Sequence, residues 1–132
     1  MLLTRASEYA LLSIDRIRKS DKPIGAEQLA LELNIPKSFL AKILQGLARE
    51  NILESRKGAY GGFILSKSLE DITLYTIILA SEGKRPAVFD CTQYASSCPN
   101  GAIGNCAISP FLGRFQRKID DFLTNLTLKD IL

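Results

Sequence analysis

The apolar residues in the first third of the chain recur with the spacing of amphipathic helices. This spacing predicts helices over about 4–19, 26–33 and 36–50, with Thr4 suited to the first N-cap. Asn34 suits a left-handed turn residue, and two short helices joined by a tight turn form a helix-turn-helix. The residues expected to face the core are Ala6, Ala10, Ile14, Ile17, Ala26, Leu29, Ala30, Leu33, Leu40, Ile43, Leu44 and Leu47.

Two short strands are predicted directly after the third helix, over 52–56 and 63–65. The loop between them carries Gly58, Gly61 and Gly62, which can adopt positive φ and bring the backbone close to a ligand. A helix-turn-helix followed by a basic, glycine-tipped hairpin is typical of a winged helix. The alternative is a plain surface hairpin behind a helical hairpin.

Two further helices are predicted in the second half. Thr73 can cap a helix over 74–82, which Gly83 ends. From Pro110 onward, apolar residues alternate at spacings of three and four, which is the seam of a coiled coil. A single helix of about 16 residues cannot bury this much apolar surface against a small head, so a two-fold dimer is preferred over packing within one chain. The seam consists of Leu112, Phe115, Ile119, Phe122 and Leu126, flanked by Phe111 and Leu123.

These elements predict a mainly α fold, with a winged helix-turn-helix head, a two-stranded wing and a long C-terminal dimerisation helix. We expect one compact unit in three segments: a DNA-binding part over 1–83, a cysteine-bearing loop over 84–107, and a dimerisation helix with a C-terminal tail over 108–132.

The composition narrows the class of protein. The 132 residues are 46% apolar and 23% charged, as in soluble globular domains. Arg5 and Glu8 interrupt the N-terminal apolar stretch, so we expect no signal peptide, no membrane span and a cytoplasmic location. The absence of histidine excludes Ser-His-Asp triads, Cys-His proteases and histidine-based zinc sites. Residues 1–67 hold eleven Lys/Arg and seven Asp/Glu, a net charge of +4, whereas residues 68–132 hold six and seven, so the first half would bind a polyanion.

Three cysteines, Cys91, Cys98 and Cys106, lie in a stretch rich in Ser, Asn, Gly and Pro. An odd number of cysteines cannot form a complete internal disulfide framework, and without an export signal they are interpreted as thiols. The loop has little apolar surface of its own, so a bound metal would supply its order. Thiolates favour iron–sulfur clusters, zinc or copper. A fourth ligand would be a carboxylate, a hydroxyl, a backbone group or water.

The residues together resemble the IscR/NsrR-type winged-helix regulators, which are bacterial transcription factors that sense iron–sulfur status, nitric oxide or redox state. The resemblance is carried by the helix-turn-helix, the glycine-rich run over 55–65, the segment 70–74 and the three loop cysteines, in that order along the chain. The glycine-rich wing is its most specific part. The resemblance implies a homodimer joined by the long C-terminal helix, with the cysteine loop of one subunit near the first helix of the other.

The resemblance also implies a ligand set. Members that hold a cluster with three cysteines and a carboxylate take the carboxylate from the first helix, where Glu8 stands here. The iron–sulfur assembly regulators use a histidine three residues after the last cysteine, and Ser109 occupies that position, so a Cys₃His cluster is excluded. The cofactor is then a [4Fe–4S] or [2Fe–2S] cluster held by Cys91, Cys98, Cys106 and Glu8. The alternative for Glu8 is a solvated acid stabilised by the helix dipole.

The expected function is transcriptional regulation, as a repressor or an activator, through a palindromic operator in double-stranded promoter DNA. Phosphate contacts are expected from Lys37, Lys42, Arg56 and Lys57, and base contacts from Ser38, Lys42 and Gln45. The wing is expected to approach a groove at Gly58, Tyr60 and Gly61.

Three other functions remain open at this point. The first is a cluster-free regulator with a thiol or zinc switch. The second is a small enzyme with a nucleophilic cysteine, which is disfavoured because no histidine base exists and no other base is fixed beside a cysteine. The third is an RNA-binding or protein-binding module.

Overall fold

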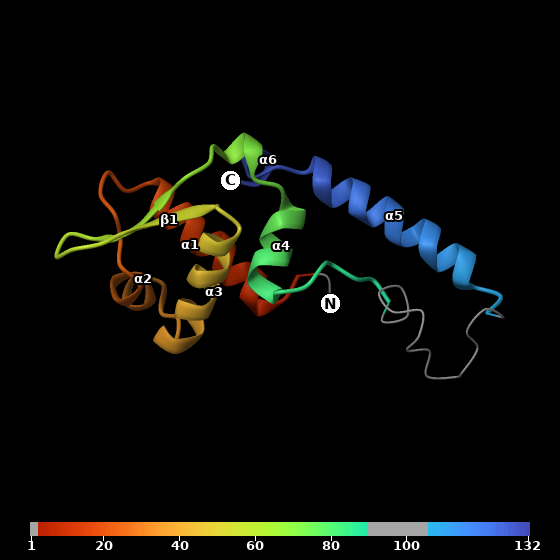
Figure 1. The fold of residues 1–132 in the computed structure, drawn as a ribbon, viewed down its shortest axis with the longest axis horizontal. Coiled ribbons are helices and arrows are strands. Elements are labelled where there is room, and N and C mark those ends of the chain that lie inside the picture. The colour runs from red at the N-terminus through yellow and green to blue at the C-terminus, as the bar shows by residue number, and fades with distance from the viewer. Residues whose placement is uncertain (1–2, 90–105) are drawn as a thin grey trace.

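A computed structural model describes residues 3–89 and 106–132. In these residues the chain is mainly helical, with one two-stranded antiparallel sheet, as the sequence predicts. Figure 1 shows a head built from the first part of the chain and a long helix leaving it. The elements in chain order are α1 (Arg5–Arg18), α2 (Ala26–Leu33), α3 (Lys37–Arg49), β1 (Leu53–Arg56), β2 (Gly62–Leu65), the 3₁₀ helix η1 (Leu69–Asp71), α4 (Leu74–Glu82), α5 (Ser109–Asn125) and α6 (Leu128–Ile131).

The core of the head lies between α1, α3 and α4. The predicted inner face of α3 is buried throughout, and Leu40, Leu44 and Leu47 have no exposed surface. Gly46 lies where α3 meets α4, since a Cβ atom there would be 2.2 Å from the backbone oxygen of Ala80. The absence of a side chain at this position therefore lets the two helices approach each other closely.

Local chemistry sets most helix ends where the sequence predicts them. Asn34 ends α2 in the left-handed region at φ 55°, and Gly83 ends α4 at φ 72°. The Thr73 hydroxyl accepts a hydrogen bond from the Thr76 amide, as a capping residue should. Thr4 is the N-cap residue of α1, but its hydroxyl makes no capping bond and donates to the carboxylate of Glu82 on α4 instead.

The wing is the antiparallel pair β1–β2, in a register that pairs Leu53 with Leu65 and Arg56 with Gly62. A bridge between Ile24 and Phe63, closed by backbone hydrogen bonds of 3.2 and 2.8 Å, attaches the segment before α2 to the wing. Gly62 has a φ of 149°, and a Cβ atom there would lie 2.4 Å from the carbonyl carbon of Ile24. The bridge therefore requires glycine at this position.

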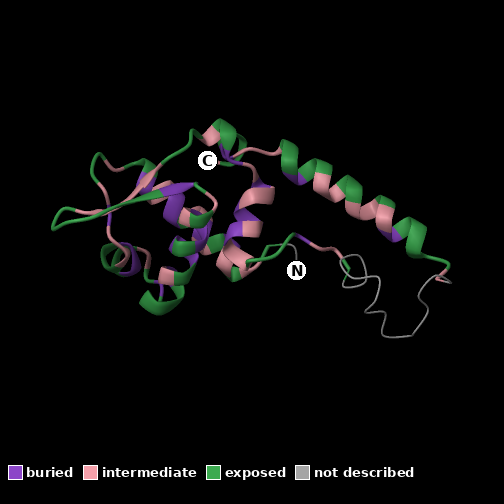
Figure 2. Ribbon diagram, viewed as in Figure 1, coloured by how far each residue is buried: buried purple, intermediate pink, exposed green. Residues whose placement is uncertain are grey.

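The C-terminal end of α5 is fastened to the head. Thr73 and Thr127 form an antiparallel bridge, with the Leu74 amide 2.8 Å from the Leu126 oxygen. Leu123 and Leu128 are fully buried in the core. The rest of α5 runs away from the head and is largely exposed or half-buried (Figures 1 and 2). No helix in residues 3–89 and 106–132 combines the length and apolar character needed to cross a membrane.

Candidate nucleic-acid interface and metal ligands

The outer face of α3 carries polar and basic side chains. Ser38, Lys42, Gln45 and Arg49 are exposed, while the opposite face of the helix packs on α1 and α4. Ala41 is half-buried on the outer side. In a helix-turn-helix the second helix presents such a face to the major groove. The predicted base-contacting residues therefore share one solvent-facing surface.

The wing tip places a second set of polar groups in solvent. Tyr60 is 93% exposed, and Lys57, Gly58 and Ala59 are also exposed. The tip is closed by a hydrogen bond of 3.0 Å from the Gly61 amide to the Gly58 oxygen. Gly58 adopts a φ of 108°, a conformation that favours glycine.

The cations of this surface fall into two groups. Lys37 lies 3.4 Å from a Glu27 carboxylate oxygen, and Arg56 lies 3.3 Å from a Glu54 carboxylate oxygen, both in exposed ion pairs. Lys42 and Lys57 have no ion pair with any described residue. Exposed pairs contribute about 0–1 kcal/mol, so neither Lys37 nor Arg56 is held away from a phosphate.

An aromatic contact next to this face was not predicted from the sequence. The ring of Phe39, on α3, meets the ring of Tyr9, on α1, edge to face with centroids 5.6 Å apart. Phe39 remains partly exposed. The signal in the sequence is weak, because Phe39 falls between the buried and the exposed side of its helix and Tyr9 follows Glu8 without any pattern of its own.

The predicted seam of α5 divides between the head and solvent. Ile119 and Leu126 pack partly against the core and Leu112 is buried, whereas Phe122 is 60% exposed. Phe115 is half-buried and stacks on Phe111, with centroids 5.8 Å apart. Leu123, expected only to flank the seam, is the α5 residue most deeply buried in the core. The phenylalanines thus form an aromatic strip that the head does not cover.

Gln116 fastens the segment after α4 to α5. Its side-chain oxygen accepts a hydrogen bond of 3.0 Å from the Val88 amide, and its nitrogen donates to the Pro86 oxygen and to Asp120. Phe89 also contacts Phe115, with centroids 5.9 Å apart. These contacts hold residues 86–89 against α5.

The predicted metal ligands are only partly within the described residues. Cys91 and Cys98 lie outside them. Cys106 is half-buried just before α5, at the end of that helix farther from the head (Figure 1). Glu8 lies in the first turn of α1, where its carboxylate is 2.8 Å from the guanidinium of Arg5. Among residues 3–89 and 106–132, no three potential metal ligands lie together.

Known proteins resemble the chain over nearly its whole length. A family model named Rrf2 and described as an iron-dependent transcriptional regulator matches residues 3–132. The HTH-type transcriptional regulator YffB of Lactococcus lactis is 32% identical over 128 residues, which cover 95% of this chain and 81% of that protein. The HTH-type transcriptional repressor NsrR of Streptomyces coelicolor is 27% identical over 135 residues, covering 100% of this chain and 88% of that one.

The fold is also found in a solved structure. The structure of CymR, the global cysteine regulator of Bacillus subtilis, superposes with a TM-score of 0.66 at 19% identity, covering 99% of this chain and 95% of that one. At this level of identity the likeness concerns the fold alone. It agrees with the winged-helix architecture predicted from the sequence.

Proposed function

The chain belongs to the Rrf2 family of iron-dependent transcriptional regulators, and on that premise we propose that it binds palindromic promoter DNA as a homodimer whose affinity depends on an iron–sulfur cluster. Its relatives are transcriptional regulators rather than enzymes. The cluster would report iron supply, redox state or nitric oxide.

The observation that carries DNA binding is the outer face of α3. Its side chains are exposed beside a fully buried inner face, and Lys42 has no ion pair within residues 3–89 and 106–132. A free ammonium group gains most from phosphate, because no internal pair has to be broken. Ser38 and Gln45 can donate to and accept from base edges, while Ala41 offers no polar group.

The roles of the remaining residues follow from their positions. Lys37, Arg56 and Lys57 would contact phosphates and fix the orientation of the head on the duplex. The wing would approach a groove through Gly58, Tyr60 and Gly61, where the two glycines have no side chain and Tyr60 is exposed. Lys42 would serve both a phosphate and a base.

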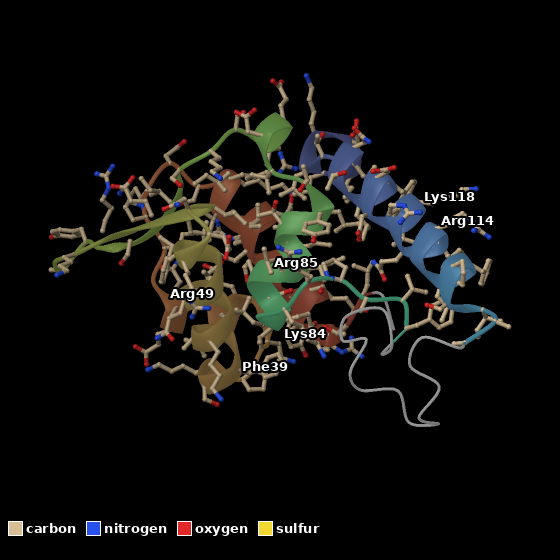
Figure 3. The ribbon with its side chains drawn as sticks, turned by 45° about the vertical axis from the view of Figure 1, so that its right-hand side comes forward. Phe39, Arg49, Lys84, Arg85, Arg114 and Lys118 are labelled. Atoms are coloured by element: carbon tan, nitrogen blue, oxygen red, sulfur yellow. The ribbon has the colours of Figure 1, made fainter. Side chains whose placement is uncertain are left out.

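Charge and shape of α5 support a dimer. The aromatic strip Phe111, Phe115 and Phe122 is the kind of exposed apolar surface that marks an interface. Next to it, the basic side chain Arg114 projects from the first half of the helix (Figure 3), whereas Asp121 lies in the second half. An antiparallel pair of α5 helices would set Arg114 of one subunit opposite Asp121 of the other, whereas a parallel pair would bring like charges together.

The proposed cluster site draws on two subunits. Three thiolates and one carboxylate fit iron. Among the described residues, the exposed Glu8 carboxylate is held only by the surface ion pair with Arg5, so it is available to a metal. Because the N-terminal end of α5, which directly follows Cys106, lies away from the head that contains α1 (Figure 1), the site would join the cysteines of one subunit to Glu8 of the partner. When bound, the cluster supplies iron whose ligation responds to oxygen, nitric oxide and iron supply.

One preparation tests the proposal. The protein is purified without oxygen, and its iron, sulfide and visible absorption are measured. Cluster-loaded and cluster-free samples are then used to select fragments from a genomic DNA library. We expect a brown protein that enriches inverted-repeat fragments in one state more than in the other. If neither the cluster-loaded nor the cluster-free protein enriches any fragment, the proposed function is contradicted.

The second candidate is a cluster-free regulator with a thiol or zinc switch. It is favoured by Cys106, whose half-exposed thiol is accessible to an oxidant or a metal. The same preparation separates the two candidates, because a colourless protein that binds DNA and contains zinc, or responds to thiol oxidation, identifies this one.

A further inference from the structure

Three helix ends meet at one end of the head. The Ser7 hydroxyl of α1 is hydrogen-bonded to the Ser81 hydroxyl of α4 at 3.1 Å, and Thr4 is hydrogen-bonded to Glu82. The Tyr9–Phe39 ring contact joins α1 to the first turn of α3. Helix α1 therefore contacts both the first turn of α3 and the C-terminal end of α4, while α3 itself meets α4 at Gly46 and Ala80.

The chain turns sharply at this end. Gly83 adopts φ 72° and closes α4 with a hydrogen bond of 2.9 Å from its amide to the Leu79 oxygen. The next two residues, Lys84 and Arg85, are exposed, and Pro86 is buried again. In Figure 3, Lys84 lies toward the same end of the head as Phe39, whereas Arg85 lies farther along α4. The turn thus presents the ammonium group of Lys84 at this end of the head.

The positive charge of Lys84 is not neutralised by any acidic residue that the structure describes. Within residues 3–89 and 106–132, no carboxylate lies within ion-pair distance of its ammonium group. The nearest acid in the sequence, Glu82, is already hydrogen-bonded to Thr4. The dipole of α4 can stabilise a cation here, at about 0.3–1 kcal/mol for an exposed site. That effect acts on the folding of the protein and predicts no effect on a ligand.

We propose that Lys84 is a phosphate-contacting residue on the α4 side of the recognition helix, outside the helix-turn-helix and the wing. This inference rests on the proposed DNA binding and extends its footprint. A recognition helix enters the major groove with its N-terminal residues toward the bases. The groove is about 12 Å wide and a helix with side chains about 10–12 Å across, so both phosphate walls come within reach.

The two phosphate walls of the major groove would then be contacted by different residues of the protein. Lys37, at the start of α3 and paired with Glu27 of α2, faces the wall on the α2 side. Lys84 follows α4 and faces the wall on the opposite side, where neither the helix-turn-helix nor the wing contributes a lysine. Contact on both sides fixes the helix laterally in the groove.

The experiment measures how DNA affinity depends on salt. Binding of a fluorescein-labelled duplex of mixed sequence is titrated by anisotropy between 50 and 200 mM KCl, with wild type, Lys84→Gln, Lys84→Arg and Lys129→Gln. Lys129 is the matched control, because it is an exposed lysine that pairs with Glu70 through α6 and η1. Lys42→Gln reports separately on the proposed recognition face.

Loss of one phosphate contact removes about 0.9 from the slope of log K against log salt. Lys84→Gln should therefore shrink the affinity ratio between the two salt concentrations by about 3.5-fold, while Lys84→Arg and Lys129→Gln keep the wild-type ratio. Thermal unfolding should change little in all variants. A wild-type slope for Lys84→Gln, with Lys42→Gln clearly reduced, overturns this inference alone. If wild type does not bind duplex DNA at all, the proposed function fails with it.

Discussion

The ring of Tyr9 meets the ring of Phe39 edge to face, with centroids 5.6 Å apart and planes at 88°. Tyr9 follows Glu8, the proposed cluster ligand on α1, and Phe39 follows Ser38, a proposed base contact on α3. The two functional faces of the head are therefore joined through one aromatic pair. A displacement of the first turns of α1 would reach the recognition helix through this contact, at the edge of the core against which Tyr9 packs.

This contact predicts a measurable coupling between the two residues. Edge-to-face aromatic pairs contribute about 0.5–1.5 kcal/mol beyond the area that they bury. A double-mutant cycle with Tyr9→Leu, Phe39→Leu and the double variant should give a coupling free energy of unfolding in that range, measured by urea denaturation. Leucine keeps apolar bulk at both positions. Strict additivity of the two substitutions would show that the rings are merely adjacent.

For Gly46→Ala we predict a loss of stability, whereas helix propensity alone would predict a gain. In an exposed helix interior, Gly→Ala stabilises by about 1 kcal/mol. At Gly46 the new methyl group would lie 2.2 Å from the Ala80 oxygen, so α3 and α4 must separate. Gly46→Ala should lower the free energy of unfolding by about 1–3 kcal/mol, as overpacking does.

Gly25 is the control for this substitution. A Cβ atom there meets no atom within 4 Å, and its φ of −75° suits alanine. Alanine is a poorer N-cap residue than glycine, but it reduces the conformational freedom of the unfolded chain, so the two effects oppose each other and Gly25→Ala should change stability by less than about 1 kcal/mol. Roughly equal effects of the two substitutions would contradict the close approach of α3 and α4.

The α5 helix predicts a dimer that can be disrupted without damage to the head. Phe122 is 60% exposed in the single chain, so Phe122→Glu should leave the fold of the head intact. In the proposed dimer it places a charge in an apolar seam, and sedimentation equilibrium at micromolar concentration should show monomers. Circular dichroism checks that the helices remain. A wild-type protein that is itself monomeric under these conditions would rule out the dimer.

Charge reversal tests the orientation of that dimer. Arg114→Glu and Asp121→Arg should each weaken self-association, because each sets like charges opposite one another in an antiparallel pair. The double variant should recover most of the affinity between subunits. No recovery, with the helical content unchanged, would contradict the antiparallel arrangement.

Lys57, in the wing, gives a prediction that distinguishes a phosphate contact from a base contact. Lys57 is exposed at the wing and has no ion pair with a described residue. Lys57→Ala should weaken binding to all sequences alike and flatten the salt dependence by about one unit of slope. Relaxed specificity at one base pair would instead make Lys57 a base-reading residue.

The parts of the fold that the sequence predicts well are those governed by local chemistry. Asn34, Thr73 and Gly83 end or begin helices through interactions within a few residues, and the inner face of α3 follows from its period. Helix α6 was missed because four residues carry no period, although Thr127 and Asp130 form a capping box that could have indicated it.

Long-range contacts decide what the sequence pattern leaves open. The period of α5 identifies its apolar residues, but the bridge between Thr73 and Thr127 determines which of them face the head. Leu123 is therefore in the core, while Phe122 is in solvent. The candidate ligands can be identified by residue type, whereas the proposed site would also need a second chain, which the periodicity of one chain does not describe.

The fourth cluster ligand gives the most discriminating prediction. The ion pair of Glu8 with Arg5 is exposed, so its loss costs about 0–1 kcal/mol and Glu8→Ala should still fold and dimerise. A carboxylate is a harder ligand than a thiolate, so its iron is the labile corner of the cluster. The cluster of Glu8→Ala should decay faster in air or respond differently to nitric oxide, whereas Cys91→Ala, Cys98→Ala and Cys106→Ala should each lose it. Arg5→Gln, which keeps the carboxylate, is the control.

Mixed dimers locate this ligand between the subunits. A dimer of one Glu8→Ala chain and one Cys106→Ala chain retains one complete site only if the cysteines of one subunit use Glu8 of the other. Such dimers, isolated with two different affinity tags, should hold one cluster with the wild-type lifetime. If every cluster in the mixed dimer is as short-lived as in Glu8→Ala, the ligand comes from the same chain. If Glu8→Ala keeps the wild-type absorption, lifetime and DNA response, Glu8 is a surface acid, and Ser109, a small molecule or Asp90, which lies outside the described residues, fills the fourth position.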